Sequence, residues 1–205
     1  MKTSEHWLDF CLRPVGEVSR EFQSLGVRTF REAALYVQSL PYGRNVDRAD
    51  ARSVLREGKG TCSTKHALLA MLAKENNIPV RLMVGIYLMN ETNTPGVGRV
   101  LEKHGFKEIP EAHCYLRLSE RYLDFTRLTV PTNGTALSFL VEKEIAPEGI
   151  GEEKIRFHQD YLKHWVTSPG VPIKDWREVW EIREACIAAL AQSKCTSNPR
   201  HQGNN

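Results

Sequence analysis

The sequence predicts an α+β fold, in which helices come before and after a segment of strands. Three observations carry this prediction. A helix of good helix-forming residues starts at Cys62 and is apolar on most of its sides. The apolar run 80–89 follows it and is typical of a strand inside a sheet. Two short alternating segments, residues 113–118 and 122–125, then suit the two strands of a hairpin.

The composition is that of an ordinary globular protein with one sizeable core. Of the 205 residues, 41% are hydrophobic and 26% are charged. We expect one domain over residues 1–192, with a core at about 29–130, a helical part at 150–192 and a disordered tail at 193–205. The net charge of +3 is too small to indicate a nucleic-acid surface, so we expect no nucleic-acid partner.

Neither a signal peptide nor a membrane-spanning segment is predicted. Residues 1–10 carry charges and lack an apolar run, and no stretch approaches the roughly 20 apolar residues that a bilayer requires. The five cysteines are odd in number and include no C-x-x-C pair. We therefore expect a cytoplasmic protein with no membrane partner and no disulfide framework. The cysteines are Cys11, Cys62, Cys114, Cys186 and Cys195.

Two helices are expected before Cys62. Thr29 and Glu32 have the spacing of a capping box, which predicts a helix from there to about Ser39. A short helix after Asp50 should end at Gly58 in the left-handed conformation that glycine favours.

After Cys62 the chain should form a helix to about residue 76, the strand 80–89 and a long loop at 90–112 with room for a helical turn at 99–103. Ordered loops of this length usually serve a site, so we expect it to cover the site and set substrate choice. Two helices follow residue 150, separated by residues 168–172, and Trp176 and Trp180 should anchor the second to the core.

Cys62 stands at a helix N-terminus, where backbone N–H groups and the helix dipole stabilise a thiolate. Gly58 and Gly60 let the backbone approach a substrate closely, and the N–H of Cys62 would then point toward an oxyanion. A cysteine at the start of a buried helix is more often a small core residue than a nucleophile. The hypothesis of a nucleophilic Cys62 therefore needs catalytic partners elsewhere in the chain.

His113 and Asp124 are the candidate partners. If Leu118 and Ser119 form a two-residue turn, residue 113 pairs with residue 124 and both side chains share one face. The carboxylate would then accept a hydrogen bond from one ring nitrogen while the other nitrogen faces the thiol. A shift of one residue would move Asp124 to the opposite face. The alternatives are a half-buried strand histidine and a solvated carboxylate.

Three segments together resemble the signature of the transglutaminase-like proteins. Residues 60–72, followed by 77–81, resemble the family's cysteine helix and its "G-I-P-A-R" strand. Residues 112–115 resemble its "H-A-W" strand, and residues 122–126 resemble its aspartate strand. The resemblance implies a papain-like core of a small, bacterial-type member, in which the Cys62 helix packs on an antiparallel sheet that carries His113 and Asp124.

The sequence departs from the family's pattern near both candidate residues. Cys114 replaces the usual small residue after the histidine, no tryptophan follows it, and Lys65 and His66 lie near the start of the cysteine helix. His66 lies one turn after Cys62 and is an alternative base, although we expect it to be structural.

Papain-like enzymes often supply a second oxyanion donor from a loop upstream of the cysteine. By this resemblance Asn45 is the candidate donor and Tyr42 its hydrogen-bonding companion, with ordinary turn chemistry as the alternative. No metal site is expected, because residues 113 and 114 point to opposite faces of a strand. No cofactor is expected either.

The predicted function is a cysteine-dependent acyl transfer on amide bonds of a peptide or of a glutamine side chain, through Cys62, His113, Asp124 and a thioester. The expected partner is thus a peptide or protein amide. Water as acceptor gives a protease or deamidase and an amine gives a transglutaminase, and we expect hydrolysis. The alternatives are a catalytically silent binding or scaffold protein with the same fold and an acetyltransferase that uses coenzyme A.

Overall fold

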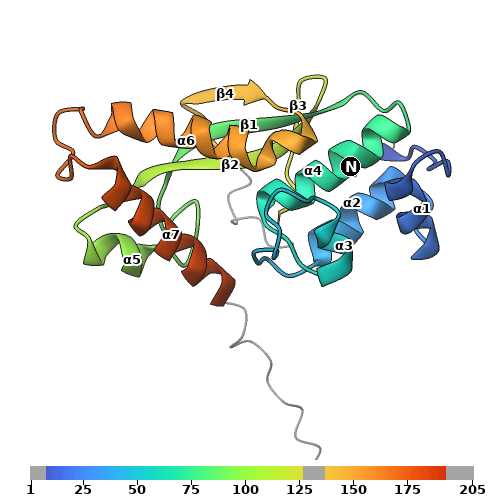
Figure 1. Cartoon of the computed structure of the whole chain (residues 1–205), viewed down its shortest axis with the longest axis horizontal. Coiled ribbons are helices and arrows are strands. Elements are labelled where there is room, and N and C mark those ends of the chain that lie inside the picture. Colours follow the sequence, from blue (N-terminus) through green and yellow to red (C-terminus); the bar gives the residue numbers. More distant parts are fainter. Residues whose placement is uncertain (1–7, 127–136, 193–205) are drawn as a thin grey trace, which may run out of the picture.

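The computed structural model describes residues 8–126 and 137–192, and it has helices at both ends of a small sheet (Figure 1). The elements, in chain order, are α1 (Glu17–Ser24), α2 (Phe30–Ser39), α3 (Ser53–Glu57), α4 (Cys62–Glu75), β1 (Val80–Met89), α5 (Gly98–Lys103), β2 (Ile109–Leu118), β3 (Arg121–Leu123), β4 (Val141–Glu144), the short 3-10 helix η2 (Pro147–Ile150), α6 (Glu152–Trp165) and α7 (Trp176–Gln192).

The four strands form one antiparallel sheet in the order β3-β2-β1-β4. β1 has a partner on each side, so the prediction of an interior strand at residues 80–89 is confirmed. The α+β fold class is confirmed too, with α4 packed on β1 and β2 and with helices after the sheet.

The predicted helix boundaries before Cys62 hold because local hydrogen bonds fix them. The Thr29 hydroxyl accepts from the Glu32 backbone N–H at 3.1 Å, and the Glu32 carboxylate accepts from the Thr29 N–H at 3.0 Å, which completes the capping box. Gly58 ends α3 with a φ of 62°, a conformation that costs glycine nothing. Both predictions are confirmed.

The predicted hairpin register is wrong by two residues. β2 pairs with β3 through Leu116 and Leu123 and through Leu118 and Arg121, so the turn is at residues 119–120 rather than 118–119. Ser119 takes a φ of 50°, as tight hairpin turns require of a central residue. Because side chains alternate with a period of two, this shift keeps residues 113 and 124 on one face.

The long loop is shorter than predicted, because β2 begins at Ile109 instead of His113. The expected helical turn is present as α5, which packs against α7. The tail predicted at residues 193–205 lies outside the described residues, and the single-domain boundary stays a prediction.

Apolar side chains form two clusters at the two ends of the sheet. Val84 and Cys114 pack in a cluster with side chains of α1 to α4. Met89 and Ile109 pack in a second cluster with side chains of α5, α6 and α7. Figure 1 shows the same division, with α1 to α4 on one side and α5 and α7 on the other. No helix in the described parts of the chain is long and apolar enough to cross a membrane.

Candidate active site

Cys62 is the first residue of α4, and its side chain is buried, with 7% of its surface exposed. The residue before it, Thr61, has its N–H bound by the Thr64 hydroxyl at 3.0 Å, which fixes the entry to the helix. The first-turn N–H groups of a helix have no partner within the helix, so they are donors directed to the region around the thiol.

His113 and Asp124 lie next to each other on the sheet, as predicted from the sequence. His113 Nε2 is 2.8 Å from Asp124 Oδ2, and the Tyr122 hydroxyl donates to the same oxygen at 3.0 Å. The other carboxylate oxygen accepts from the Thr126 N–H at 2.9 Å. Because Nε2 is engaged, Nδ1 is the ring nitrogen left to face the Cys62 thiol, and the two groups are close enough to shift each other's pKa.

The charges in the site favour an ionised pair. Burial would raise the pKa of the Cys62 thiol, but the positive charges of Lys154 and His113 outweigh it and lower this pKa to about 6. Burial would likewise lower the pKa of His113, but the negative charges of Asp124 and Cys62 raise it to about 10. Near neutral pH the pair is therefore mainly thiolate and imidazolium.

His66 has a structural position. Its Nδ1 lies 2.9 Å from the Cys62 carbonyl oxygen, and its Nε2 accepts a hydrogen bond from the Phe125 N–H at 2.8 Å. Burial lowers the pKa of His66 to about 4 in spite of the nearby Asp124, so the ring is neutral at pH 7. Both ring nitrogens are occupied, which leaves neither to accept a proton from the thiol.

Lys65 is another departure from the family's pattern, and its hydrogen bonds connect two segments of the site. Its ammonium is fully buried and donates to the Leu40 carbonyl at 2.6 Å and to the Thr126 carbonyl at 2.9 Å. Lys65 and His66 therefore attach the segment around Asp124 to the helix that begins at Cys62. A charged residue is tolerated there because carbonyl groups surround it.

Asn45 and Tyr42 are both beside the site, in the loop before α3. The Asn45 amide donates to the Lys59 carbonyl at 3.0 Å and accepts from the Thr64 hydroxyl at 2.8 Å, so it connects the loop to α4. Tyr42 pairs with Gly60 in an isolated parallel bridge. These contacts fix the position of the backbone that leads to Cys62. The oxyanion role of Asn45 and Tyr42 stays a prediction.

Gly60 is needed for packing, not only for access to a substrate. A methyl group at this position would lie 2.9 Å from Lys65 Cγ and 2.9 Å from Val54 Cγ2, closer than real contacts allow. Protein atoms fill the space beside Gly60, and the close approach of this backbone to a substrate stays a prediction.

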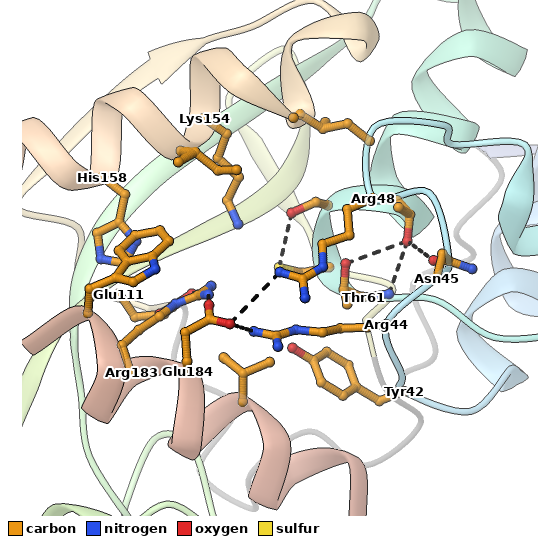
Figure 2. A pocket seen from close by; sticks show the side chains of 18 residues that line it. Tyr42, Arg44, Asn45, Arg48, Thr61, Glu111, Lys154, His158, Arg183 and Glu184 are labelled. Atoms are coloured by element: carbon orange, nitrogen blue, oxygen red, sulfur yellow. Dashed lines mark hydrogen bonds and ion pairs between the residues drawn. The ribbon is translucent and has the colours of Figure 1, made fainter. Parts of the chain in front are cut away.

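A cavity of about 80 Å³ lies beside Cys62 (Figure 2). Its walls come from residues 42–48, from the start of α4, from Glu111 on β2 and from residues 150–187 of η2, α6 and α7. None of the lining residues belongs to the segment 90–108, so the prediction that this loop covers the site is wrong for this cavity. The C-terminal helices α6 and α7 form this part of the cavity wall instead.

The wall formed by α6 and α7 is attached to β2 next to His113. Arg183 of α7 forms two hydrogen bonds with the Glu111 carboxylate, Nε to Oε2 at 2.6 Å and a terminal nitrogen to Oε1 at 2.7 Å. His158 of α6 lies 2.9 Å from the Pro110 carbonyl oxygen through Nε2. Burial lowers the pKa of His158 to about 4, so this ring is neutral and donates.

Sequence reasoning missed Glu111, Lys154 and Arg183. Glu111 lies two residues before His113, and the rule of alternating faces would have found it if β2 had been extended to Ile109. Lys154 and Arg183 are ordinary polar positions of amphipathic helices in the sequence, and only the packing shows that they are buried. No group of three or more potential metal ligands is found in the part of the chain that the structure describes.

A helix that starts at a cysteine and packs on an antiparallel sheet defines the α+β class of papain-like folds. Residues 23–119 match the family model of the transglutaminase-like superfamily. This match supports the resemblance that the sequence signature predicts. The match contains Cys62 and His113 and ends before Asp124 and the C-terminal helices. No curated protein and no solved structure matches the chain.

Proposed function

We propose that this protein is a cysteine-dependent acyl-transfer enzyme that acts on amide bonds and releases its product by hydrolysis. The observation that carries the proposal is the contact of 2.8 Å between His113 Nε2 and Asp124 Oδ2, with the second ring nitrogen left for a thiol at a helix N-terminus. The match of residues 23–119 to the transglutaminase-like superfamily supports the same class of chemistry.

In the first half of the reaction, the Cys62 thiolate attacks the carbonyl carbon of an amide. A carbon–sulfur bond forms, and the electron pair of the carbonyl moves to its oxygen, where the Cys62 N–H donates to it. The protonated His113 then gives its proton to the amide nitrogen. The carbon–nitrogen bond breaks, so that an amine leaves and a thioester remains on Cys62.

In the second half, neutral His113 removes a proton from a water molecule, and the resulting hydroxide attacks the thioester. The carbon–sulfur bond breaks, the acid leaves and the thiolate and imidazolium are restored. Asp124 touches no reacting atom in this scheme. Its role is to hold the ring of His113 in one orientation and to stabilise its positive charge.

The first test is the pH dependence of iodoacetamide labelling at each cysteine, followed by mass spectrometry. Cys62 should label rapidly from about pH 6 upward, in line with its lowered pKa. In His113→Ala this advantage should disappear, because the imidazolium that stabilises the thiolate is gone. His164→Ala, which removes an exposed histidine of α6, is the matched control and should leave the profile unchanged.

The second test looks for the thioester. The protein is incubated with a peptide mixture and quenched in acid, and intact mass spectrometry is used to find an acyl group on Cys62 that hydroxylamine removes. Cys62→Ser should show no such adduct. An unreactive Cys62, or labelling that is the same in His113→Ala, would rule out this mechanism.

A silent binding protein is the second candidate, and the burial of the site favours it. Only 7% of Cys62 and 9% of His113 are exposed, so an incoming amide needs the walls to open. Normal folding and normal peptide binding with no labelling advantage at Cys62 would support this candidate over the enzyme.

A further inference from the structure

Lys154 is a buried lysine that has no hydrogen-bond or ion-pair partner among the described residues, and it is directed into the cavity beside Cys62. It belongs to α6, and 7% of its surface is exposed. Figure 2 shows its ammonium pointing from α6 into the space above Glu184 and Arg183. Among the residues that the structure describes, none forms a hydrogen bond or an ion pair with this ammonium.

The other cations of the cavity already have carboxylate partners, because Arg44, Arg48 and Arg183 share Glu111 and Glu184. Arg183 is bound to Glu111 through two hydrogen bonds, and Arg44 lies 2.7 Å from Glu184. Arg48 lies 3.8 Å from the same carboxylate. Lys154 has no carboxylate partner among the described residues, and the cavity carries four cationic side chains against two carboxylates and the Cys62 thiolate.

An ammonium in a largely buried side chain is unfavourable when it has lost most of its water without gaining a protein acceptor. Such a group is stabilised when an anion enters, since a charge-assisted hydrogen bond is strong where water is scarce. One free ammonium beside arginines that already have partners suits a single negative charge. A carboxylate fits this requirement, and a cavity of about 80 Å³ has room for several water molecules or for one such group.

We propose that Lys154 binds a carboxylate of the substrate, so that the amide attacked by Cys62 belongs to an acidic peptide segment. The carboxylate is either an Asp or Glu side chain or the C-terminal carboxylate of the peptide. This inference rests on the proposed function, because it names the substrate class of the same site. Lys154 is here a specificity-determining residue, and it takes no part in bond formation.

The charge on Lys154 gives the inference a second consequence. The same ammonium is the main positive charge that lowers the pKa of the Cys62 thiol. A bound carboxylate neutralises it, so an acidic ligand should reduce the reactivity of Cys62 as well as cover it. Binding is thus visible through the labelling of Cys62, without any turnover.

The experiment measures how strongly three peptide pools slow iodoacetamide labelling of Cys62 at pH 7. One pool has Asp and Glu side chains with amidated ends, a second has neutral side chains with free C-terminal carboxylates, and a third is neutral and amidated. In the wild-type protein, one of the two pools that carry carboxylates should reach half-protection of Cys62 at a concentration at least about tenfold below that of the neutral, amidated pool. The pool that does so identifies the source of the carboxylate.

In Lys154→Met this preference should fall to less than about twofold, whereas Lys163→Met should keep it in full. Lys163 is the matched control, because it lies on the same helix but is paired with Asp160 at the surface. If Lys154→Met does not fold, Lys154→Gln provides the same test. Equal protection by all three pools, or a preference that persists without Lys154, would overturn the inference.

Calorimetric titration of His113→Ala with the same pools separates this inference from the proposed function. That variant loses the labelling advantage of Cys62 if the enzyme hypothesis is right, yet it should still bind the acidic pool more tightly than the neutral one. Loss of the acidic preference in His113→Ala, with the fold intact, would count against Lys154 as the binding group.

Discussion

The two walls of the cavity hold their charges in different ways, and two buried lysines show the contrast. Lys65 does not line the cavity but belongs to α4, whose first turn forms one wall, and it donates to two backbone carbonyls. Lys154, on the wall formed by α6 and α7, reaches into the cavity and has no acceptor among the described residues. Both lysines are buried, and they differ mainly in what surrounds their ammonium groups.

This contrast separates structural charges from functional ones. A buried cation with all its hydrogen bonds made stabilises one conformation, as Lys65 does by fixing the segment around Asp124 to α4. A buried cation without partners costs stability and persists where a ligand completes it. The α4 wall thus positions the reacting groups, and we infer that the α6 and α7 wall selects what reaches them.

The largest effect is expected where the α7 wall is attached to the sheet. Glu111→Leu removes the two hydrogen bonds between Glu111 and Arg183 and leaves the buried guanidinium only the partly exposed Glu184 as a partner, so the free energy of unfolding should fall by about 3 kcal/mol. Urea denaturation measures the change. The double variant Glu111→Leu, Arg183→Met removes both charges and should recover most of the loss, since replacing a whole buried pair by apolar groups is often neutral.

The same pair predicts a difference at acid pH. Burial would raise the pKa of Glu111, but Arg183 lowers it to about 2, below the ordinary value of 4.5. A carboxyl group with a lowered pKa contributes stability above its unfolded pKa and loses it as the pH falls through the folded one. The wild-type protein should therefore lose this contribution to its stability between pH 4.5 and about pH 2. The free energy of unfolding of the double variant should change less over the same pH range.

The second effect compares the two lysines directly. Lys65→Met leaves the carbonyls of Leu40 and Thr126 without their buried donor, so we expect a loss of about 2–4 kcal/mol. Lys154→Met removes an unpaired charge, so we expect a change below about 1 kcal/mol or a gain in stability. The two variants are compared by urea denaturation under one buffer condition. Similar losses for both would mean that Lys154 is a structural residue like Lys65.

The third effect is smaller and concerns the reacting pair. Asp124→Asn keeps the shape of the side chain but removes the charge that raises the pKa of His113 to about 10. The imidazolium then stabilises the thiolate less well, and a rise of about one unit in the pKa of the thiol should slow the labelling of Cys62 at pH 6 by about fivefold. Cys11, which is exposed, provides an internal reference in each sample. An unchanged labelling rate would show that Asp124 does not act through His113.

The sequence predicted the parts of the site that follow local rules. The N-terminus of α4 at Cys62 and the strand β1 follow from helix caps and apolar runs. The common face of His113 and Asp124 was predicted with the wrong register, and it survived because an error of two residues preserves side-chain alternation.

The rest of the site depends on packing between distant segments, which local patterns do not encode. Arg183 lies 72 positions after its partner Glu111, and no spacing rule joins them. Lys154 looks like any solvated lysine of an amphipathic helix until α6 is placed against the sheet. The same limit made the loop at 90–112 look like the cover of the site, although α6 and α7 form that wall.

The smallest effect tests whether the contrast between the walls is local. Thr29→Ala removes the hydroxyl that caps α2, far along the chain from either wall, and should cost about 1 kcal/mol of stability. Because Thr29 belongs to neither wall, the labelling profile of Cys62 and its protection by acidic peptides should not change. If the labelling profile of Cys62 changed in Thr29→Ala, a general loss of stability would be enough to alter the site. The effects of Lys65, Lys154 and Asp124 would then need correction for stability before they are assigned to separate walls.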